Sequence, residues 1–231
     1  MTLPQFDVSY RNAIDRVGQL AAELDGRQLG IPVPATPEWT VHEVLAHLVG
    51  VSADVANGRL DGVTGDDWTA RQVGERRDRS VHELLAEWRE VAPAVESSLV
   101  GQRFTGPNAA ADLICHESDL HEALNLRSVD RAHWDDPFLS TMMLLLGARL
   151  KGISTVTIVD ERGSSWRCGS GEHETTLRTS GYELFRAMFS RRSRRQIADW
   201  DWTSAPTDAM VDCFGVFGPR DDDQPIPPTG G

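Results

Sequence analysis

Lysine is almost absent from this sequence, and basic residues are outnumbered by acidic ones. Lys151 is the only lysine, and 23 basic residues face 35 acidic ones, which gives a formal net charge of -12. Nucleic acids and anionic membranes select for clustered cations, and the one basic run, RRSRR at 191–195, is short. We therefore expect neither nucleic acid nor a membrane as a partner.

Long apolar runs and paired cysteines are also missing. No basic segment followed by an apolar one opens the chain, and no run of about 18 apolar residues occurs. We therefore expect a soluble, cytoplasmic protein. The three cysteines, Cys115, Cys168 and Cys213, are odd in number and lack CxxC spacing, which predicts buried thiols instead of a disulfide framework.

The first half of the chain carries helical periodicity. Apolar residues recur at helical spacing over 5–25, 41–57 and 81–99, and again in a fourth segment that follows Gly106 and Pro107 and ends near Asn125. Thr40 with Glu43, and Ser80 with Glu83, have the spacing of capping boxes. Four amphipathic helices with moderate connectors predict a four-helix bundle, a fold that builds metal sites from inward-facing side chains.

In the second half of the chain, the spacing of apolar residues changes from that of helices to that of short strands. A fifth helix is expected from Asp135, with Phe138, Met142, Leu145 and Leu146 on its buried side. Three short strands follow, STVTIVD, SSWRC and HETTLRT, and then helices near 182–189, 193–202 and 208–214. We therefore predict an α+β protein with a helical domain over 1–151, a small mixed α/β domain over 152–218, and a disordered tail over 219–231.

The stretch ADLICHESDLHEALN, residues 111–125, places ionisable groups on a helix face that is otherwise apolar. Glu117 and His121 are one helical turn apart, roughly 5–6 Å, close enough to hold one ion between them. A solvated pair or a buried hydrogen bond would give the same pattern. An upstream histidine, His47, lies at the edge of the apolar stripe of its helix and favours the metal interpretation. The segments TVHEVLAH and SVHELLAE are similar, and Glu87 in the second occupies the position of His47 in the first. This similarity also makes Glu87 a candidate ligand.

Two segments carry a resemblance to a known family. EWTVHEVLAHLVG with the later Glu-x-x-x-His, and SGYELFRAMFSRRSRRQIADWDW, resemble the mycothiol-dependent maleylpyruvate isomerase family over roughly residues 10–215. The resemblance implies a DinB-like four-helix bundle and a metal triad of His47, Glu117 and His121. Two imidazoles and a carboxylate suit a catalytic zinc ion with one open position, although other divalent ions fit nearly as well.

The resemblance also implies an active-site arginine, for which Arg191 and Arg192 are both candidates. A solvated basic face is the alternative for this pair. Ser190 stands where the family tends to have glycine, so the local backbone is expected to differ.

The expected function is metal-dependent chemistry with a low-molecular-weight thiol. The resemblance implies mycothiol, held as the thiolate by a zinc or other divalent ion and directed at a small electrophile, with either thiol transfer or isomerisation as the outcome. An arginine of the 191–192 pair would bind a substrate carboxylate. The alternatives are a metal-dependent hydrolase of a small ester or amide, and a non-catalytic binding protein. The chain is expected to act as a monomer or a homodimer.

Overall fold

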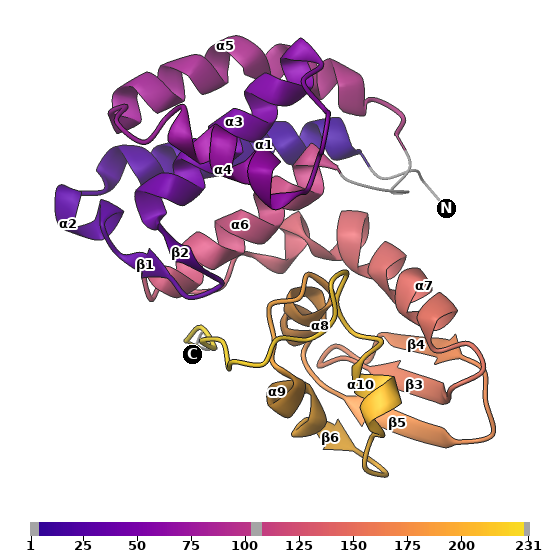
Figure 1. The fold of residues 1–231 in the computed structure, drawn as a ribbon. Coiled ribbons are helices and arrows are strands. Elements are labelled where there is room, and N and C mark those ends of the chain that lie inside the picture. Colours follow the sequence, from indigo (N-terminus) through magenta and orange to yellow (C-terminus); the bar gives the residue numbers. More distant parts are fainter. Residues whose placement is uncertain (1–4, 103–107, 229–231) are drawn as a thin grey trace. The chain divides into compact units, whose positions relative to one another are not determined.

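The computed structural model describes residues 5–102 and 108–228, which form two compact units (Figure 1). Among these described residues, the first unit comprises 5–102, 108–129 and 226–228, and the second comprises 130–225. Gly106 and Pro107, which we expected ahead of the fourth helix, lie outside the described residues. The domain boundary expected near Lys151 falls inside the second unit, because the helix before it packs on the sheet of that unit.

The first unit is built on a four-helix bundle, as predicted. Its long helices are α1 (Phe6–Glu23), α3 (Val41–Asn57), α5 (Val81–Leu99) and α6 (Ala109–Ala123). Helices α1 and α3 each pack against both α5 and α6, which closes the bundle. Both predicted capping boxes form, with Thr40 and Ser80 as the N-caps of α3 and α5. Each box satisfies backbone N–H groups that the first helical turn leaves without partners.

A polar trio lies inside this otherwise apolar core. The Tyr10 hydroxyl of α1 is 2.7 Å from Ser52 Oγ of α3, and Trp88 Nε1 of α5 donates to the same Ser52 oxygen at 2.9 Å. All three residues are buried. Because each polar atom has a partner, three helices are fixed in one register without an unsatisfied buried group.

The short helix α4 (Asp66–Gly74) packs against α3. A Cβ added to Gly50 of α3 would lie 2.5 Å from Gln72 Cβ, so glycine permits the close approach of the two helices.

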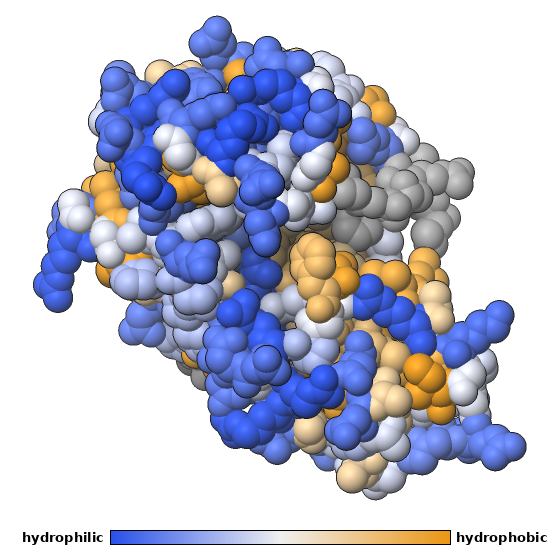
Figure 2. All heavy atoms as spheres, viewed as in Figure 1, coloured by the Kyte–Doolittle hydropathy of each residue, from blue (hydrophilic) through white to orange (hydrophobic). Residues whose placement is uncertain are grey.

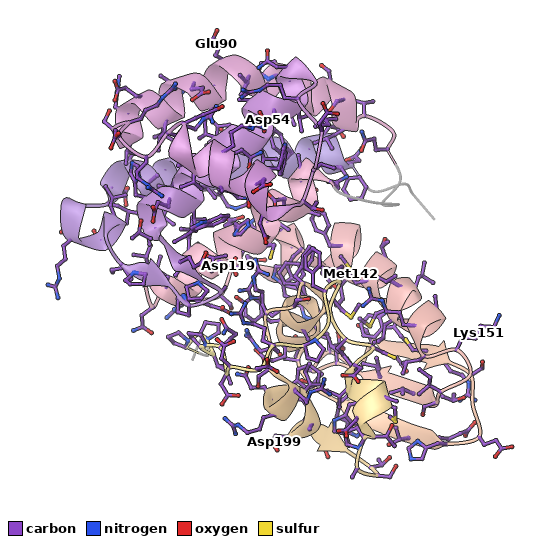
Figure 3. All side chains as sticks on the ribbon, in the orientation of Figure 1. Asp54, Glu90, Asp119, Met142, Lys151 and Asp199 are labelled. Carbon is purple, nitrogen blue, oxygen red and sulfur yellow. The ribbon has the colours of Figure 1, made fainter. Side chains whose placement is uncertain are left out.

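Asp54 is fully buried and accepts hydrogen bonds from Arg71 and Gln72 at 2.8 Å, whereas Glu90 on α5 projects into solvent (Figure 3). The face of this unit shown in Figure 2 is predominantly hydrophilic.

The Pro- and Gly-rich connector between α1 and α3 contains more structure than we expected. The helix α2 (Gly26–Leu29) is followed by a two-stranded antiparallel hairpin of β1 (Pro32–Val33) and β2 (Thr36–Thr40). Strand β2 leads directly into α3, and β1 contacts α6. The hairpin therefore holds Trp39, near the end of β2, close to the start of α3.

The second unit joins a four-stranded sheet to helices. The strands are ordered β4-β3-β5-β6, with β3 parallel to β5 and the other two pairs antiparallel. The elements are η1 (Arg131–His133), the π-helical turn η2 (Asp135–Leu139), α7 (Ser140–Arg149), β3 (Thr155–Val159), β4 (Ser165–Gly169), β5 (Glu174–Arg178), α8 (Gly181–Met188), α9 (Arg194–Ala198), β6 (Asp201–Trp202) and α10 (Asp208–Val211). The predicted α+β class and the three predicted strands are confirmed; β6 was not predicted.

The four-residue link between β4 and β5 passes close to the start of β3. Gly169 has φ +78°, and a Cβ there would lie 2.3 Å from the Ser154 carbonyl oxygen. Only glycine meets both requirements without strain. This tight passage allows β5 to pair with β3 on the side opposite β4 after so short a connection.

Part of the tail that we expected to be disordered is bonded to the second unit. Arg220 N donates to the Arg192 carbonyl at 3.0 Å, and Arg194 N donates to the Arg220 carbonyl at 2.9 Å. Gln224, which is buried, exchanges hydrogen bonds with Gln196. These partners lie far away in sequence, so the composition of the tail did not reveal them.

Across the described ranges, no helix is long and apolar enough to cross a membrane.

Candidate metal centre

The candidate site begins with His47 in the second turn of α3. The Thr40 and Glu43 capping box fixes where this helix starts, and so fixes which way each later side chain projects. The His47 side chain is only 4% exposed, and it faces α6, the helix that packs against α3. This places an imidazole inside the bundle.

Helix α6 contributes a carboxylate and a second imidazole to the same place. Asp112 and His116 are four residues apart, so their side chains share one face of the helix. Asp112 Oδ2 lies 3.5 Å from His47 Nε2, and Asp112 Oδ1 lies 3.7 Å from His116 Nε2. The two imidazole ring centroids are 5.1 Å apart, edge to face.

The spacing of these groups fits a metal ion. One ligand atom from each of the three side chains lies within 4.8 Å of the other two. The nitrogen–oxygen distances of 3.5 and 3.7 Å exceed those of ordinary N–H···O hydrogen bonds. Tetrahedral ligands held at about 2.0–2.2 Å from zinc are themselves about 3.3–3.6 Å apart.

Burial differs among the three side chains. Those of His47 and His116 are 4% and 7% exposed, whereas that of Asp112 is 34% exposed. Trp39 covers the histidines: its ring centroid lies 4.9 Å from that of His47 and 6.4 Å from that of His116. A ligand entering from solvent would therefore approach beside Asp112, while the imidazoles are shielded by the bundle and the indole.

The structure does not bring Glu117 or His121 to this group. Arg16 of α1 donates to both Glu117 oxygens at 2.7 Å, and this carboxylate side chain is 2% exposed. His121 Nδ1 lies 2.6 Å from the Arg127 carbonyl oxygen, in the segment after α6. Of the predicted triad, only His47 belongs to the cluster that the fold assembles.

The physical reason is that α6 is buried on nearly every side. Its residues from Ala110 to Leu120 are all buried apart from Asp112, which is partly exposed. A prediction that assumes one buried face selects Glu117 and His121, because they align with the leucines. The same four-residue spacing of a carboxylate and a histidine occurs at Asp112 and His116, and this is the signal that could have identified the pair.

The other predicted site residues have defined surroundings. Glu87 pairs with Arg76 at 2.6 Å and with Arg79 at 2.6 Å, which commits it to an ion-pair cluster on α5. Arg192 is fully buried, and its Nε and Nη2 donate to Glu183 at 2.7 Å. Arg191 is partly exposed, and its Nη1 donates to the Phe189 carbonyl oxygen at 3.0 Å.

Ser190 adopts the conformation that glycine favours. Its φ is +59°, in the left-handed region, and its hydroxyl accepts a hydrogen bond from Phe217 N at 3.0 Å. The backbone therefore keeps a glycine-like turn at the position where we expected the serine to change it. The turn brings Arg191 and Arg192 out of α8.

Comparison with known proteins agrees with this architecture. The family model described as the mycothiol maleylpyruvate isomerase N-terminal domain matches residues 10–103. No curated protein matches the sequence significantly. A crystal structure of the mycothiol-dependent maleylpyruvate isomerase has a TM-score of 0.57 and 12% identity, covering 90% of this chain and 98% of that one. The crystal structure of a histidine-to-alanine mutant of that enzyme has a TM-score of 0.56 and 11% sequence identity, with the same coverage of both chains. At these identities the structural likeness shows the fold.

Proposed function

We propose that the chain is a metal-dependent enzyme that uses a low-molecular-weight thiol, because the model of the mycothiol maleylpyruvate isomerase N-terminal domain matches residues 10–103 and the fold is that of the mycothiol-dependent enzyme. Mycothiol is the thiol that the family name supports. The substrate class is a small electrophile, and the reaction is thiol transfer or thiol-assisted isomerisation.

The observation that carries this proposal is the cluster of His47, Asp112 and His116. Two imidazoles and one carboxylate are a donor set of catalytic zinc sites, which leave a further position for water or substrate. We propose these three residues as the metal ligands, in place of the set that included Glu117 and His121. Zinc fits the donor set best, and other divalent ions fit nearly as well.

A divalent ion bound there would supply the positive charge that keeps a thiol deprotonated at neutral pH. The side chains of this chain determine where that chemistry takes place. His47 and His116 hold their nitrogens inside the bundle, where few waters compete for them. Asp112 lies at the exposed side of the cluster, so the thiol and the electrophile would enter past it.

Trp39 gives the entry an apolar wall. Its indole is only partly exposed and lies over the His47 ring. An apolar wall excludes water from a thiolate and so preserves its reactivity toward carbon electrophiles. An aromatic face also suits a flat, unsaturated substrate.

The family resemblance implies that Arg191 or Arg192 binds a substrate carboxylate, and the surroundings of the two guanidinium groups differ. Arg192 already uses two of its nitrogens on Glu183 in a fully buried position, which gives it a structural role. The guanidinium of Arg191 is partly exposed and would present a planar set of donors to a carboxylate.

An activity assay of the metal-loaded protein tests the proposal. Mycothiol with maleylpyruvate, and mycothiol with a general aryl halide electrophile, are compared with the same mixtures lacking the thiol. We expect thiol-dependent turnover that His116→Ala abolishes and His121→Ala retains. Ester hydrolysis without added thiol would instead support a hydrolase, and absence of turnover with every electrophile would overturn the enzymatic proposal.

A further inference from the structure

The loop between α8 and α9 carries both candidate arginines, and a segment near the C-terminus lies beside it. We call residues 189–193 the arginine loop and residues 216–224 the strap; both belong to the second unit (Figure 1). The first strap residue, Val216, donates its backbone N–H to the Met188 carbonyl oxygen at 2.9 Å. The strap therefore begins where α8 ends and the arginine loop starts.

Further hydrogen bonds join the strap to the loop. Phe217 N donates to Ser190 Oγ at 3.0 Å, and Arg220 N donates to the Arg192 carbonyl oxygen at 3.0 Å. The Arg220 carbonyl oxygen accepts from Arg194 N at 2.9 Å, which completes a parallel bridge. Because later strap residues meet later loop residues, the two segments run in the same direction, as neighbouring strands of a parallel sheet do.

Side chains bind the strap to the far end of the arginine loop. Ser193 is fully buried, and its hydroxyl donates to Asp223 Oδ1. The side-chain amide of Gln196 accepts from Gln224 N at 3.0 Å and donates to the Gln224 carbonyl oxygen at 2.7 Å. Ser193 and Gln196 also form the capping box of α9. The strap is therefore bonded to both residues that cap this helix.

These bonds restrain a loop that carries a candidate binding group. Loops are ordinarily more mobile than the helices they connect. Here the strap contacts Ser190 and Arg192, the two neighbours of Arg191 in the chain, and Glu183 of α8 binds the Arg192 guanidinium. Binding a carboxylate through two parallel hydrogen bonds requires a guanidinium oriented to within about 10–20°. A restrained backbone on both sides of Arg191 favours that orientation.

We propose that the strap is a positioning element for the arginine loop and that it keeps the loop in the conformation that binds a substrate carboxylate. The proposal rests on the proposed function, which supplies the substrate. It adds that the carboxylate site depends on residues far later in the chain, none of which contacts the substrate in this account. It also assigns a role to a segment whose composition predicted disorder.

Proteolysis tests the restraint of the loop without an activity assay. Arg220→Pro removes the N–H that binds the Arg192 carbonyl oxygen, and Arg220→Ala is the matched control because it loses the same side chain and keeps that N–H. Trypsin cleaves after arginine, so cleavage within residues 191–195, located by mass spectrometry, reports opening of the loop. We expect cleavage about 10-fold faster in Arg220→Pro than in Arg220→Ala, because losing the hydrogen bond raises the open population. Equal rates would overturn the proposal.

Asp223 provides a second pair of variants if thermal unfolding shows that Arg220→Pro does not fold. Both Asp223→Ala and Asp223→Asn lose the ion pair with Arg195. Only Asp223→Ala leaves the buried Ser193 hydroxyl without an acceptor, since asparagine keeps an oxygen there. We expect faster cleavage of the loop in Asp223→Ala than in Asp223→Asn, and equal rates in this pair would also overturn the proposal.

Steady-state kinetics separate positioning from a general loss of stability. With maleylpyruvate and mycothiol, we expect Arg220→Pro to raise KM about 10-fold over Arg220→Ala, with kcat within about 2-fold. With an aryl halide that has no carboxylate, the two variants should have the same KM. Equal KM values for maleylpyruvate would overturn the positioning role and leave the proposed function intact. A wild type without turnover would overturn the proposed function and with it the carboxylate role, whereas the tryptic comparison would still decide whether the strap restrains the loop.

Discussion

Arg16 of α1 and Glu117 of α6 form a two-pronged ion pair inside the bundle, with both hydrogen bonds at 2.7 Å. The Glu117 side chain is 2% exposed and that of Arg16 is 26% exposed. The pair ties α1 to α6 at the residue that directly follows His116. It accounts for a buried acid on α6 without a metal.

Removing the arginine should destabilise the bundle. Arg16→Met leaves Glu117 buried without its charge partner, and breaking a buried pair in this way costs about 3–5 kcal/mol. We expect that loss in the free energy of unfolding measured by urea titration. Arg11→Met, which breaks an exposed pair with Glu96, should cost much less, because solvent screens a surface pair. Similar costs for the two variants would show that the Glu117 pair contributes no more than a surface pair.

The sequence predicted those features of the structure whose signal lies within a few neighbouring residues. The helices, three strands and capping boxes followed from spacing within a few residues, and all were found. His47 was also named, from its place at the edge of an apolar stripe and from the family resemblance. Asp112 and His116 were missed because neighbouring helices, which the local pattern does not contain, bury α6 on nearly every side.

The remaining differences also involve partners distant in sequence. Strand β6 has two residues and forms by pairing with β5, and its segment was predicted as the end of a helix over 193–202. The tail was expected to be disordered from its composition, although backbone bonds of Arg220 tie it to the loop after α8. In both cases the deciding contact lies more than twenty residues away.

The tryptophan beside the site should report metal binding. The Trp39 ring centroid is 4.9 Å from that of His47, so a paramagnetic ion held by the cluster would quench its fluorescence. We expect Co²⁺ to lower the emission of the wild type, with most of the change lost in Trp39→Phe. Co²⁺ binding itself, followed by its visible absorption, should persist in that variant. A full fluorescence change in Trp39→Phe would place the ion near another tryptophan.

Tyr10 should make the bundle sensitive to alkali. Burial raises the pKa of this phenol from its ordinary value of 10.0 to about 12, because the phenolate is poorly solvated in the core. The unfolded state therefore ionises first. Stability from this group is complete below pH 10 and is lost as pH rises toward 12, at up to about 1.4 kcal/mol per pH unit.

Urea unfolding at pH 9 and pH 11 tests this dependence. Tyr10→Phe should be less stable at pH 9, since it loses the hydrogen bond to Ser52, but its stability should fall less between the two pH values. The comparison is favourable because the chain has one lysine and two tyrosines. An equal fall in both proteins would contradict the assignment to Tyr10.

Gly169 should be far less tolerant of a side chain than a glycine in open space. Gly169→Ala meets both a positive φ and the Ser154 carbonyl oxygen, which together cost about 2 kcal/mol or more. Gly163 has φ +82° with no atom within 4 Å of an added Cβ, so Gly163→Ala bears only the backbone cost of about 1–2 kcal/mol. Thermal unfolding should rank Gly169→Ala below Gly163→Ala, and the reverse order would show that the link after β4 can relax.

The most direct test of the metal centre is zinc content per chain in untagged wild type, His47→Ala, His116→Ala and His121→Ala, measured by elemental analysis after equilibration with Zn²⁺ and removal of the excess. We predict one equivalent in the wild type and in His121→Ala, and none in His47→Ala or His116→Ala, with all four proteins folded by circular dichroism. Loss of zinc in His121→Ala with retention in His116→Ala would contradict the cluster of His47, Asp112 and His116, as would a wild type that takes up no zinc.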